Sequence, residues 1–510
     1  MTKRILSLLA TSVIVVSCLP DIDLNNPNLS LNSEWVVPLA KTKLSLADIV
    51  QEDSVVTVDP DNLVRIIYHQ DSIFGYGVRD FAQIPNQDPL TQTVKVGDPG
   101  ISFTTSLATI AGAELKEASF LTGKLIWTIY NPDSVSNVDV EIDLGNGWLG
   151  NGNPLVFTLN GVGAVSTGEI DLAGANFDFS VGANPYNNLD FNFEVLSSTT
   201  APAGTDVDIS IQYVDLVPDG LRGYFGEREQ AIPSNSFQLD LGGVEDFVSG
   251  LYLENPILKL KVASNIGLPL ELEVDVDGVS KDGNVVPLSL QNQIVTGPTV
   301  IGDWDTTTIL IDKTTSNIVD FISNLPNDLV FGGNIATNPA GNTGVDNFVG
   351  SNGEVRVDLE VELPLEIRAQ DMVIEQEIPD IDWGGLQDQE NPLEKLELFF
   401  SVKNGFPLET DLEMILMNES GNVIDTLTLA NLMQAAPVDG NGRAIGTMDT
   451  RASLLLVEDD LAKLLSTTSI TLRSTFNTTN AGQTIVKIYN DYSIEVALAV
   501  RTKLNLDVAP

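Results

Sequence analysis

Large apolar side chains recur at every second position in several stretches of this chain. In 138–144, Val, Ile and Leu alternate with Asp and Glu, and the same period of two returns in 270–277, 355–363 and 494–500. This period is typical of strands with one face on a core and the other in water. We therefore expect most acidic side chains on the solvent face of these strands.

Turn signals separate the alternating stretches, for example Asp277-Gly278 and the Gly-rich run 439–442. Helical patterns are few and short, and they cover 44–50, 317–324 and 458–465. The pattern predicts a mainly β protein made of tandem antiparallel β-sandwich-like modules with a few short helices.

One order of strands and turns occurs twice along the chain. Each copy contains Glu-Asn-Pro, a strand, an Asn, Pro-Leu, an alternating strand and Gly-Asn-Val. Pro269 lies 14 positions before Gly283, and Pro407 lies 14 positions before Gly421. A fainter copy includes Asn131. We predict a unit of about 138 residues that is duplicated and triplicated.

The repeat leads to a specific expectation about two asparagines. Asn265 and Asn404 should each end a core strand at equivalent positions, because Asn is favoured in turns. The predicted division of the chain follows from the same repeat: a signal peptide over 1–17, an anchor segment and N-terminal β region over 18–120, and β modules over 121–250, 251–388 and 389–510.

The repeat core is similar to the signature of the water-stress/late-embryogenesis (WHy-like) β-sandwich domain. The likeness is carried by 254–290 and 390–428, in the order strand, Asn, turn, Pro-Leu, strand, Gly turn and strand. The resemblance implies a β-sandwich module and implies nothing about catalysis.

The N-terminus resembles the signal peptide of a bacterial lipoprotein. Lys3 and Arg4 precede an apolar run over 5–17, which is shorter than the ~20 residues that a spanning helix needs. The run ends in Val-Val-Ser-Cys18, which resembles a lipobox, and Cys18 is the only cysteine in the chain. The resemblance implies that Cys18 is lipidated and becomes the first mature residue, and more than one acyl chain gives stable anchoring. An ordinary signal peptide that happens to end in Cys is the alternative.

The residues after Cys18 bear on location. Leu19 stands where an Asp retains enterobacterial-type lipoproteins in the inner membrane, and 20–23 resemble the acidic export tag of Bacteroidota lipoproteins. The layout as a whole resembles uncharacterised cell-envelope lipoproteins of Bacteroidota. We expect a protein of the outer membrane, on its periplasmic face or on the cell surface, attached to the membrane through the lipid on Cys18.

The charge of the chain restricts its partners. The sequence has 71 acidic and 26 basic residues, for a net charge of −45. Such a chain repels nucleic acid and anionic membrane surfaces, so we expect no nucleic-acid partner. Asp-x-Asp pairs are candidate Ca²⁺ ligands, but none fits an EF-hand loop in full; they lie at Asp59/Asp61, Asp275/Asp277, Asp303/Asp305 and Asp380/Asp382. We assign no metal and no cofactor.

Catalytic signals are weak. His69 is the only histidine, and neither a Gly-x-Ser-x-Gly elbow nor a Ser-x-x-Lys motif accompanies it. We interpret His69 as a polar strand residue. Catalysis by a pair of carboxylates, as in glycosidases, is the alternative that the acidic composition leaves open.

We predict that this chain is not an enzyme but an envelope protein with a binding, adhesion or scaffolding role, whose partner is an unknown envelope protein, a glycan or a hydrophobic ligand. One alternative is a carrier of a hydrophobic ligand, which would need a continuous apolar tunnel. The other is a carbohydrate-binding protein, which exposed Trp127, Trp304 or Trp383 on one flat face would support.

Overall fold

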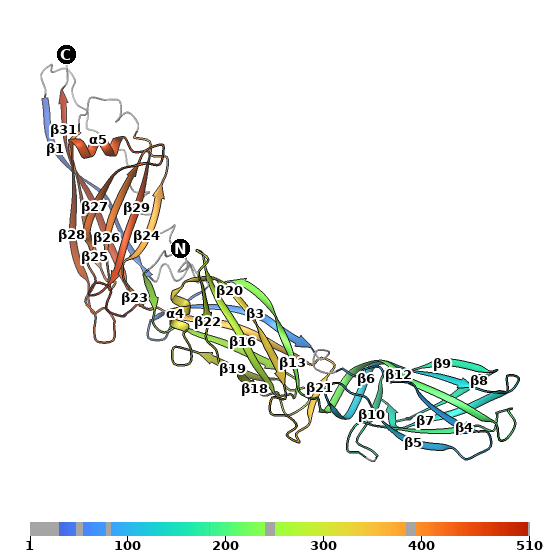
Figure 1. Cartoon of the computed structure of the whole chain (residues 1–510). Helices are drawn as coiled ribbons and strands as arrows, with labels where there is room; N and C mark the ends of the chain where they lie inside the picture. The colour runs from blue at the N-terminus through green and yellow to red at the C-terminus, as the bar shows by residue number, and fades with distance from the viewer. Residues whose placement is uncertain are drawn as a thin grey trace.

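Three β-sandwich modules lie end to end in an elongated molecule (Figure 1). The computed structural model describes residues 30–46, 55–77, 83–182, 184–239, 250–383 and 393–507. Of the described residues, 62% lie in strands and 3% in helices, which confirms the predicted mainly β fold. No helix in these ranges is long and apolar enough to cross a bilayer.

The distal module covers residues 83–225. One sheet has the order β4-β12-β6-β9 and faces a second with the order β5-β11-β7-β8, while β10 pairs with both β6 and β7. Its strands are β4 (Leu90–Lys95), β5 (Ile101–Ser106), β6 (Glu114–Tyr130), β7 (Asn137–Leu149), β8 (Pro154–Val162), β9 (Val165–Asp171), β10 (Ala175–Asp178), β11 (Asn188–Val195) and β12 (Asp206–Tyr224).

The middle module follows the same plan. Its sheets have the orders β19-β15-β22-β3-β2 and β13-β20-β16-β17, with β18 also on β16. Its elements are β2 (Val56–Val58), β3 (Val64–Gly77), β13 (Arg228–Gln238), β15 (Ile257–Ser264), β16 (Leu270–Ser280), β17 (Val285–Leu288), β18 (Gln293–Val295), β19 (Asp305–Ile311), α4 (Ile318–Ser323), β20 (Pro326–Thr337) and β22 (Glu354–Pro364).

The terminal module contains both ends of the described chain. Its sheets have the orders β1-β31-β25-β28 and β24-β29-β26-β27. Its elements are β1 (Ser30–Ser45), β24 (Met372–Ile378), β25 (Leu393–Asn404), β26 (Leu408–Met417), β27 (Val423–Met433), β28 (Met448–Val457), α5 (Glu458–Leu465), β29 (Ser469–Thr478) and β31 (Ser493–Asp507).

Short strands connect the modules. A small sheet of β14 (Leu251–Leu253), β23 (Glu366–Ala369) and β30 (Val486–Lys487) joins strands from the middle and terminal parts of the chain. At the other junction, β21 (Asn347–Gly350) pairs with β12 of the distal module. The modules are therefore linked by hydrogen-bonded strands as well as by chain connections.

The modules are nested along the chain. The whole distal module is inserted between β3 and β13 of the middle module, and both of these modules are inserted between β1 and β24 of the terminal module. This arrangement differs from the predicted division: strands before residue 120 join all three modules, and residue 120 itself lies inside β6. The predicted boundary at 388 falls outside the described residues.

The predicted repeat is present as strand pairing. Strand β15 lies between β19 and β22, and its equivalent β25 lies between β28 and β31. Strands β16 and β26 are also equivalent, and each forms a hairpin with the strand that follows it. Gly283 and Gly421 close these hairpins with φ of +80° and +75°, which glycine reaches without a Cβ penalty. The distal module repeats the same strand order, so the unit is triplicated.

The predicted equivalence of the two asparagines is off by one position. Asn404 is the last residue of β25 and pairs with Ile494 on β31. The last residue of β15 is Ser264, which pairs with Val355 on β22, so Ser264 is the equivalent of Asn404. The Oγ of Ser264 accepts the N–H of Ile266 at 3.1 Å, as Oδ1 of Asn404 accepts the N–H of Phe406 at 2.8 Å. Ser264 thus makes the local bond that Asn404 makes in the other copy, and Asn265 lies one position later.

The two helices predicted over 317–324 and 458–465 are confirmed as α4 and α5. Of the third predicted helix, 44–50, residues 44 and 45 lie in β1, and 47–50 lie outside the described residues.

A single hydrophobic core runs through the distal and middle modules. Inward-pointing residues such as Leu125, Ile142 and Val357 are fully buried there. The same core reaches the near end of the terminal module at Met372 and Tyr492, and the rest of that module has a separate, smaller cluster around Leu416 and Leu456. Two modules are therefore filled sandwiches, and a shared core resists bending between them.

Candidate functional site

The predicted lipidation site, Cys18, lies outside the described residues. Twelve positions later, Ser30 begins β1 and pairs with Asp507 at the end of β31. Twelve residues span at most about 40 Å. The chain that follows Cys18 therefore enters the fold at the terminal module, on the edge strand of one of its sheets.

His69 lies in β3, opposite Glu360 in β22, within a ladder of ionised side chains. Its Nε2 is 3.1 Å from Oδ1 of Asp71, and Glu360 accepts hydrogen bonds from Lys259 at 3.0 Å and Lys261 at 2.5 Å. Burial opposes ionisation of Glu360, but the hydrogen bonds from Lys261 and Lys259 outweigh it and lower its pKa to about 2. The arrangement is that of a cross-strand ion-pair network.

The candidate Ca²⁺ ligands do not converge. The carboxylate of Asp59 accepts hydrogen bonds from Arg65, at 2.8 Å from Nη2, and Asp61 accepts the N–H of Leu63. Asp275 and Asp277 lie along β16 on its solvent side. Within the described ranges, no three His, Cys, Asp or Glu side chains gather closely enough to hold a metal ion.

The three tryptophans named as a candidate sugar platform lie in different places. Trp127 in the distal module packs on Gly168 of β9. Trp304 in the middle module is 48% exposed beneath the guanidinium of Arg356. Trp383, near the terminal module, donates its Nε1–H to the carbonyl of Thr467. They do not form one flat face.

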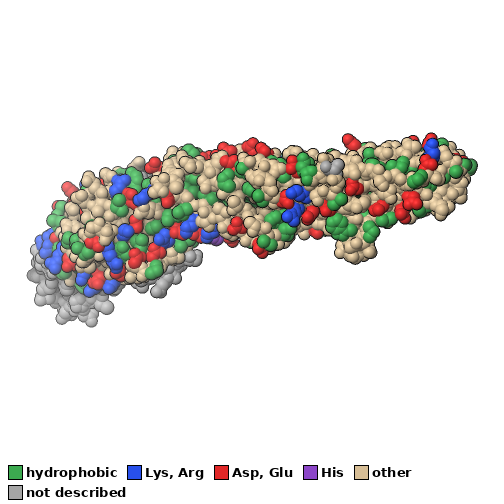
Figure 2. Space-filling view, turned by 90° about the horizontal axis from the view of Figure 1, so that it is seen from below, with side chains coloured by type: hydrophobic (Ala, Val, Ile, Leu, Met, Phe, Trp, Pro, Cys, Tyr) green, Lys and Arg blue, Asp and Glu red, His purple; other side chains and the backbone are tan. Residues whose placement is uncertain are grey.

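The structure assembles a basic face that the sequence analysis missed. We use this name for the outward face of the sheet β1-β31-β25-β28. Val402 and Asn404 in β25 point inward and are buried. Because side chains alternate along a strand, Lys403 and every second residue before it point outward, as do their cross-strand neighbours. Its basic residues are Lys41, Lys43, Lys395, Lys403, Arg451, Arg501 and Lys503. Figure 2 shows blue side chains gathered over this end of the molecule.

The acidic residues on the same face are Glu397, Asp449 and Glu495, and the pairing of β1 with β31 adds Glu34, opposite Lys503, and Asp507. Glu397 is hydrogen-bonded to Arg501, which holds the pKa of its carboxyl below the usual value. Lys43 lies 3.8 Å from Glu495. In contrast, Lys41, Lys403 and Arg451 form no ion pair with any residue that the structure describes.

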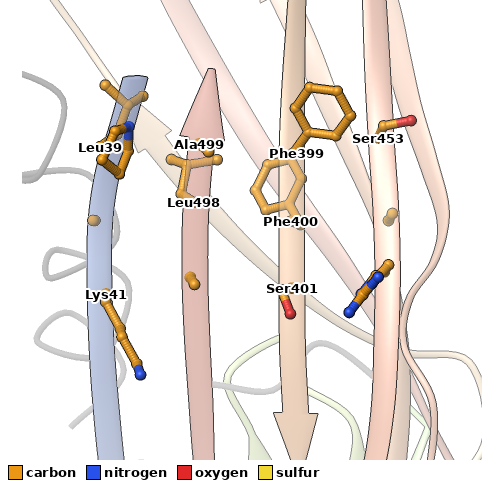
Figure 3. A pocket seen from close by; sticks show the side chains of 13 residues that line it. Leu39, Lys41, Phe399, Phe400, Ser401, Ser453, Leu498 and Ala499 are labelled. Atoms are coloured by element: carbon orange, nitrogen blue, oxygen red, sulfur yellow. The ribbon is translucent and has the colours of Figure 1, made fainter. Parts of the chain in front are cut away.

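A trough crosses the basic face (Figure 3). Its volume is about 770 Å³, and all of its lining residues come from β1, β25, β28 and β31. Two rows of outward side chains border it, Pro38–Ala499–Phe399–Ser453 and Lys41–Ala497–Ser401–Arg451. Most of these side chains are small, so the sheet backbone lies near the surface between the flanking cations.

The signal for this face was present in the sequence but dispersed. Lys41 and Lys43 lie near one end of the chain, Lys395 and Lys403 follow the predicted module boundary, and Arg501 lies near the other end. Within each strand the basic residues are separated by an even number of positions, which puts them on one face. Only the pairing of β1 with β31 and of β31 with β25 brings them together.

Comparison with known families finds no match, and comparison with curated proteins finds none either. Among solved structures, the chain is similar to a putative secreted protein from Parabacteroides distasonis, with 15% identity, a TM-score of 0.31 and coverage of 56% of this chain and 90% of that one. It is also similar to the infectious bursal disease virus VP2 subviral particle, with 10% identity, a TM-score of 0.13 and coverage of 88% and 83%.

A third similar structure is the CBM22-1-CBM22-2 tandem domain of Paenibacillus barcinonensis Xyn10C, with 8% identity, a TM-score of 0.13 and coverage of 58% and 98%. At these scores, none of the likenesses assigns a family or a function to this chain. The resemblance of the repeat to the WHy-like domain therefore stays a prediction.

Proposed function

We propose that this protein is a lipid-anchored, non-enzymatic component of the outer membrane or cell surface that acts as a stiff spacer and carries the distal module as its binding end. The nested connectivity is the observation that carries the proposal. Residues 30 and 507 meet in the terminal module, and the distal module lies at the opposite end of the molecule (Figure 1). A lipid on Cys18 would therefore hold the end remote from the distal module.

The free end of the distal module has the character of an interaction surface. The turn between β6 and β7 and the turn between β8 and β9 lie there, beyond the ends of the paired strands. Val135 is 92% exposed, Val162 is 66% exposed and Val165 is 55% exposed. Exposed apolar groups that gather in one place mark sites of protein or ligand contact, which supports a role in binding or adhesion.

The two alternative functions have less support. A carrier would need an apolar tunnel, and the distal and middle sandwiches are filled by side chains such as Phe177 and Phe321, each at most 1% exposed. A sugar platform would need aligned aromatic rings, and the three candidate tryptophans lie in separate places. We therefore retain the binding and scaffolding role.

The substitution Cys18→Ser tests the anchor. We expect the variant to lack lipid and to accumulate as unprocessed precursor, whereas Ser17→Ala should be processed and lipidated as usual. The measurement is the mass of the N-terminal peptide together with partitioning into detergent. A Cys18→Ser variant that is still cleaved before residue 18 and still partitions into detergent would refute the anchor.

A further inference from the structure

We propose that the basic face docks on an anionic lipid surface, so that the terminal module lies against the membrane to which the chain is anchored. This inference rests on the proposed anchoring and adds a second contact to it. The net charge alone predicts repulsion from anionic membranes, but that prediction treats the charge as spread evenly over the molecule.

Charge is segregated along the molecule. The distal module, 83–225, has 4 basic and 17 acidic residues. The basic face alone has 7 basic residues against the 5 acidic ones that strand pairing places with them. Local charge within about one Debye length, ~8 Å at physiological salt, decides contact with a charged surface. The basic face is therefore attracted to anionic lipid while the distal module is repelled.

Charge is also segregated across the terminal module itself. On the opposite sheet, Arg473 lies between Glu375 and Glu413, and Glu377 and Asp411 point the same way. The sandwich thus has one basic and one acidic outer face. Near an anionic surface this polarity orients the module with the sheet β1-β31-β25-β28 toward the lipid.

The geometry of the face suits a layer of phosphate headgroups. Lys41 and Arg451 stand on the two edge strands of the sheet, three strand spacings apart, which is about 14 Å. The trough between them is floored by small side chains and the strand backbone, so a headgroup can approach without a steric barrier. Lys41 lies opposite Ala497 and Arg451 lies opposite Ser401, so the charges of these two residues are available to an external anion. Lys403 lies between Asp449 and Glu495.

The position of the anchor favours this occupant. Edge strand β1 begins at Ser30, 12 positions after Cys18, so a lipid on Cys18 keeps the basic face within about 40 Å of the bilayer. The terminal module does not share one axis with the other two modules (Figure 1). A terminal module that lies on the membrane therefore does not force the distal module onto it.

Amine footprinting on vesicles tests the inference. The full-length protein is reconstituted into vesicles of phosphatidylcholine alone or of phosphatidylcholine with phosphatidylglycerol, and lysine labelling is quantified residue by residue. We expect Lys41 and Lys403 to be labelled at least about fivefold more slowly on the anionic vesicles than on the neutral ones. Lys124 of the distal module, which is on neither the basic face nor a junction, is the internal control and should not change.

A charge-neutralised variant isolates the electrostatic contact. In Lys41→Gln/Lys403→Gln/Arg451→Gln, Lys43 should lose its protection on anionic vesicles. The matched variant Lys95→Gln/Lys124→Gln/Lys313→Gln, which removes the same charge elsewhere, should keep it. Protection should also disappear near 1 M salt, where the Debye length falls to about 3 Å.

Three outcomes would overturn the docking. They are equal protection on neutral and anionic vesicles, no protection on either, and protection without vesicles that rises with protein concentration and so reveals a second copy as the occupant. The mass of the N-terminal peptide reports lipidation independently. If Cys18 carries no lipid, the proposed function fails, and flotation of the same chain with anionic vesicles still tests the basic face.

Discussion

Ionised side chains on the middle module form a ladder that holds three strands in register. Lys259 in β15 reaches both Glu360 and Glu362 in β22, and Arg65 in β3 reaches Glu362 at 2.8 Å. Glu360 is only 15% exposed, so water screens these contacts less than it screens ordinary surface pairs. The ladder is the most strongly perturbed group of titratable residues that we find on the middle module.

Glu360→Gln should destabilise the middle module by about 1–3 kcal/mol at pH 7, because Lys259 and Lys261 lose their charged partner. The folded pKa of Glu360, about 2, lies below the ordinary glutamate value of 4.5. Its contribution is therefore fully present above about pH 4.5 and is lost as the pH falls through about 2. Urea unfolding of wild type and variant at several pH values measures the difference.

Glu354→Gln is the matched control. Glu354 lies in the same strand, is 48% exposed and is 3.7 Å from Arg356, so its loss should change stability by no more than about 0.5 kcal/mol. A Glu360→Gln penalty that stays constant from neutral pH to pH 2 would contradict the assignment of the effect to the carboxylate.

At the scale of elements, the middle and terminal sandwiches each depend on an N-terminal strand that is distant in the chain from the rest of the module. In the terminal module, β1 pairs with β31 from Ser30–Asp507 to Ser45–Ser493, with one bulge after Pro38. Without β1, the edge of β31 would present unpaired N–H and C=O groups, which is a template for aggregation. The N-terminal strand is therefore part of the C-terminal fold.

We expect residues 372–507 alone to be unstable or to aggregate, and the same segment to fold when 30–46 are appended after residue 507. The direct connection from residue 507 to residue 30 suffices, because Ser30 already lies opposite Asp507, as the ends of two strands do in an antiparallel hairpin. Circular dichroism and size-exclusion chromatography distinguish the two chains.

A control with the order of 30–46 scrambled keeps the composition but not the alternation of side chains. It should fail to rescue, because inward and outward residues would no longer match β31. A stable, monomeric 372–507 without β1 would show that the strand is dispensable.

At the scale of the whole molecule, length and stiffness come from three sandwiches joined by paired strands. Long strands such as β6, with 17 residues, and β20 and β25, with 12 each, indicate the length of the modules, since each residue adds about 3.4 Å. Three modules end to end therefore extend to roughly 120–150 Å. The shared core of the distal and middle modules opposes bending at their junction.

Small-angle X-ray scattering should give a radius of gyration of about 35–40 Å, as expected for a rod of that length. A compact chain of this size would give about 23 Å. The value should be insensitive to salt if packing, and not charge repulsion, keeps the molecule extended. A radius near 23 Å, or one that contracts strongly in salt, would contradict the stiff rod.

The sequence by itself determined the class of fold, the two short helices and the repeat. These follow from short-range patterns: alternation with a period of two, Gly at turns such as Gly283 and Gly421, and Asn404 at a strand end. It did not separate Ser264 from its neighbour Asn265, because either side chain can close the same local turn.

Only the tertiary structure decided which strands pair across the chain. The pairing of β1 with β31 joins segments more than 440 residues apart, and no local pattern encodes a partner at that distance because every alternating strand offers the same backbone groups. The nesting of the modules and the basic face both depend on this pairing. Net charge concealed the face, since a sum over 97 charged side chains contains no information about which of them the sheets bring together.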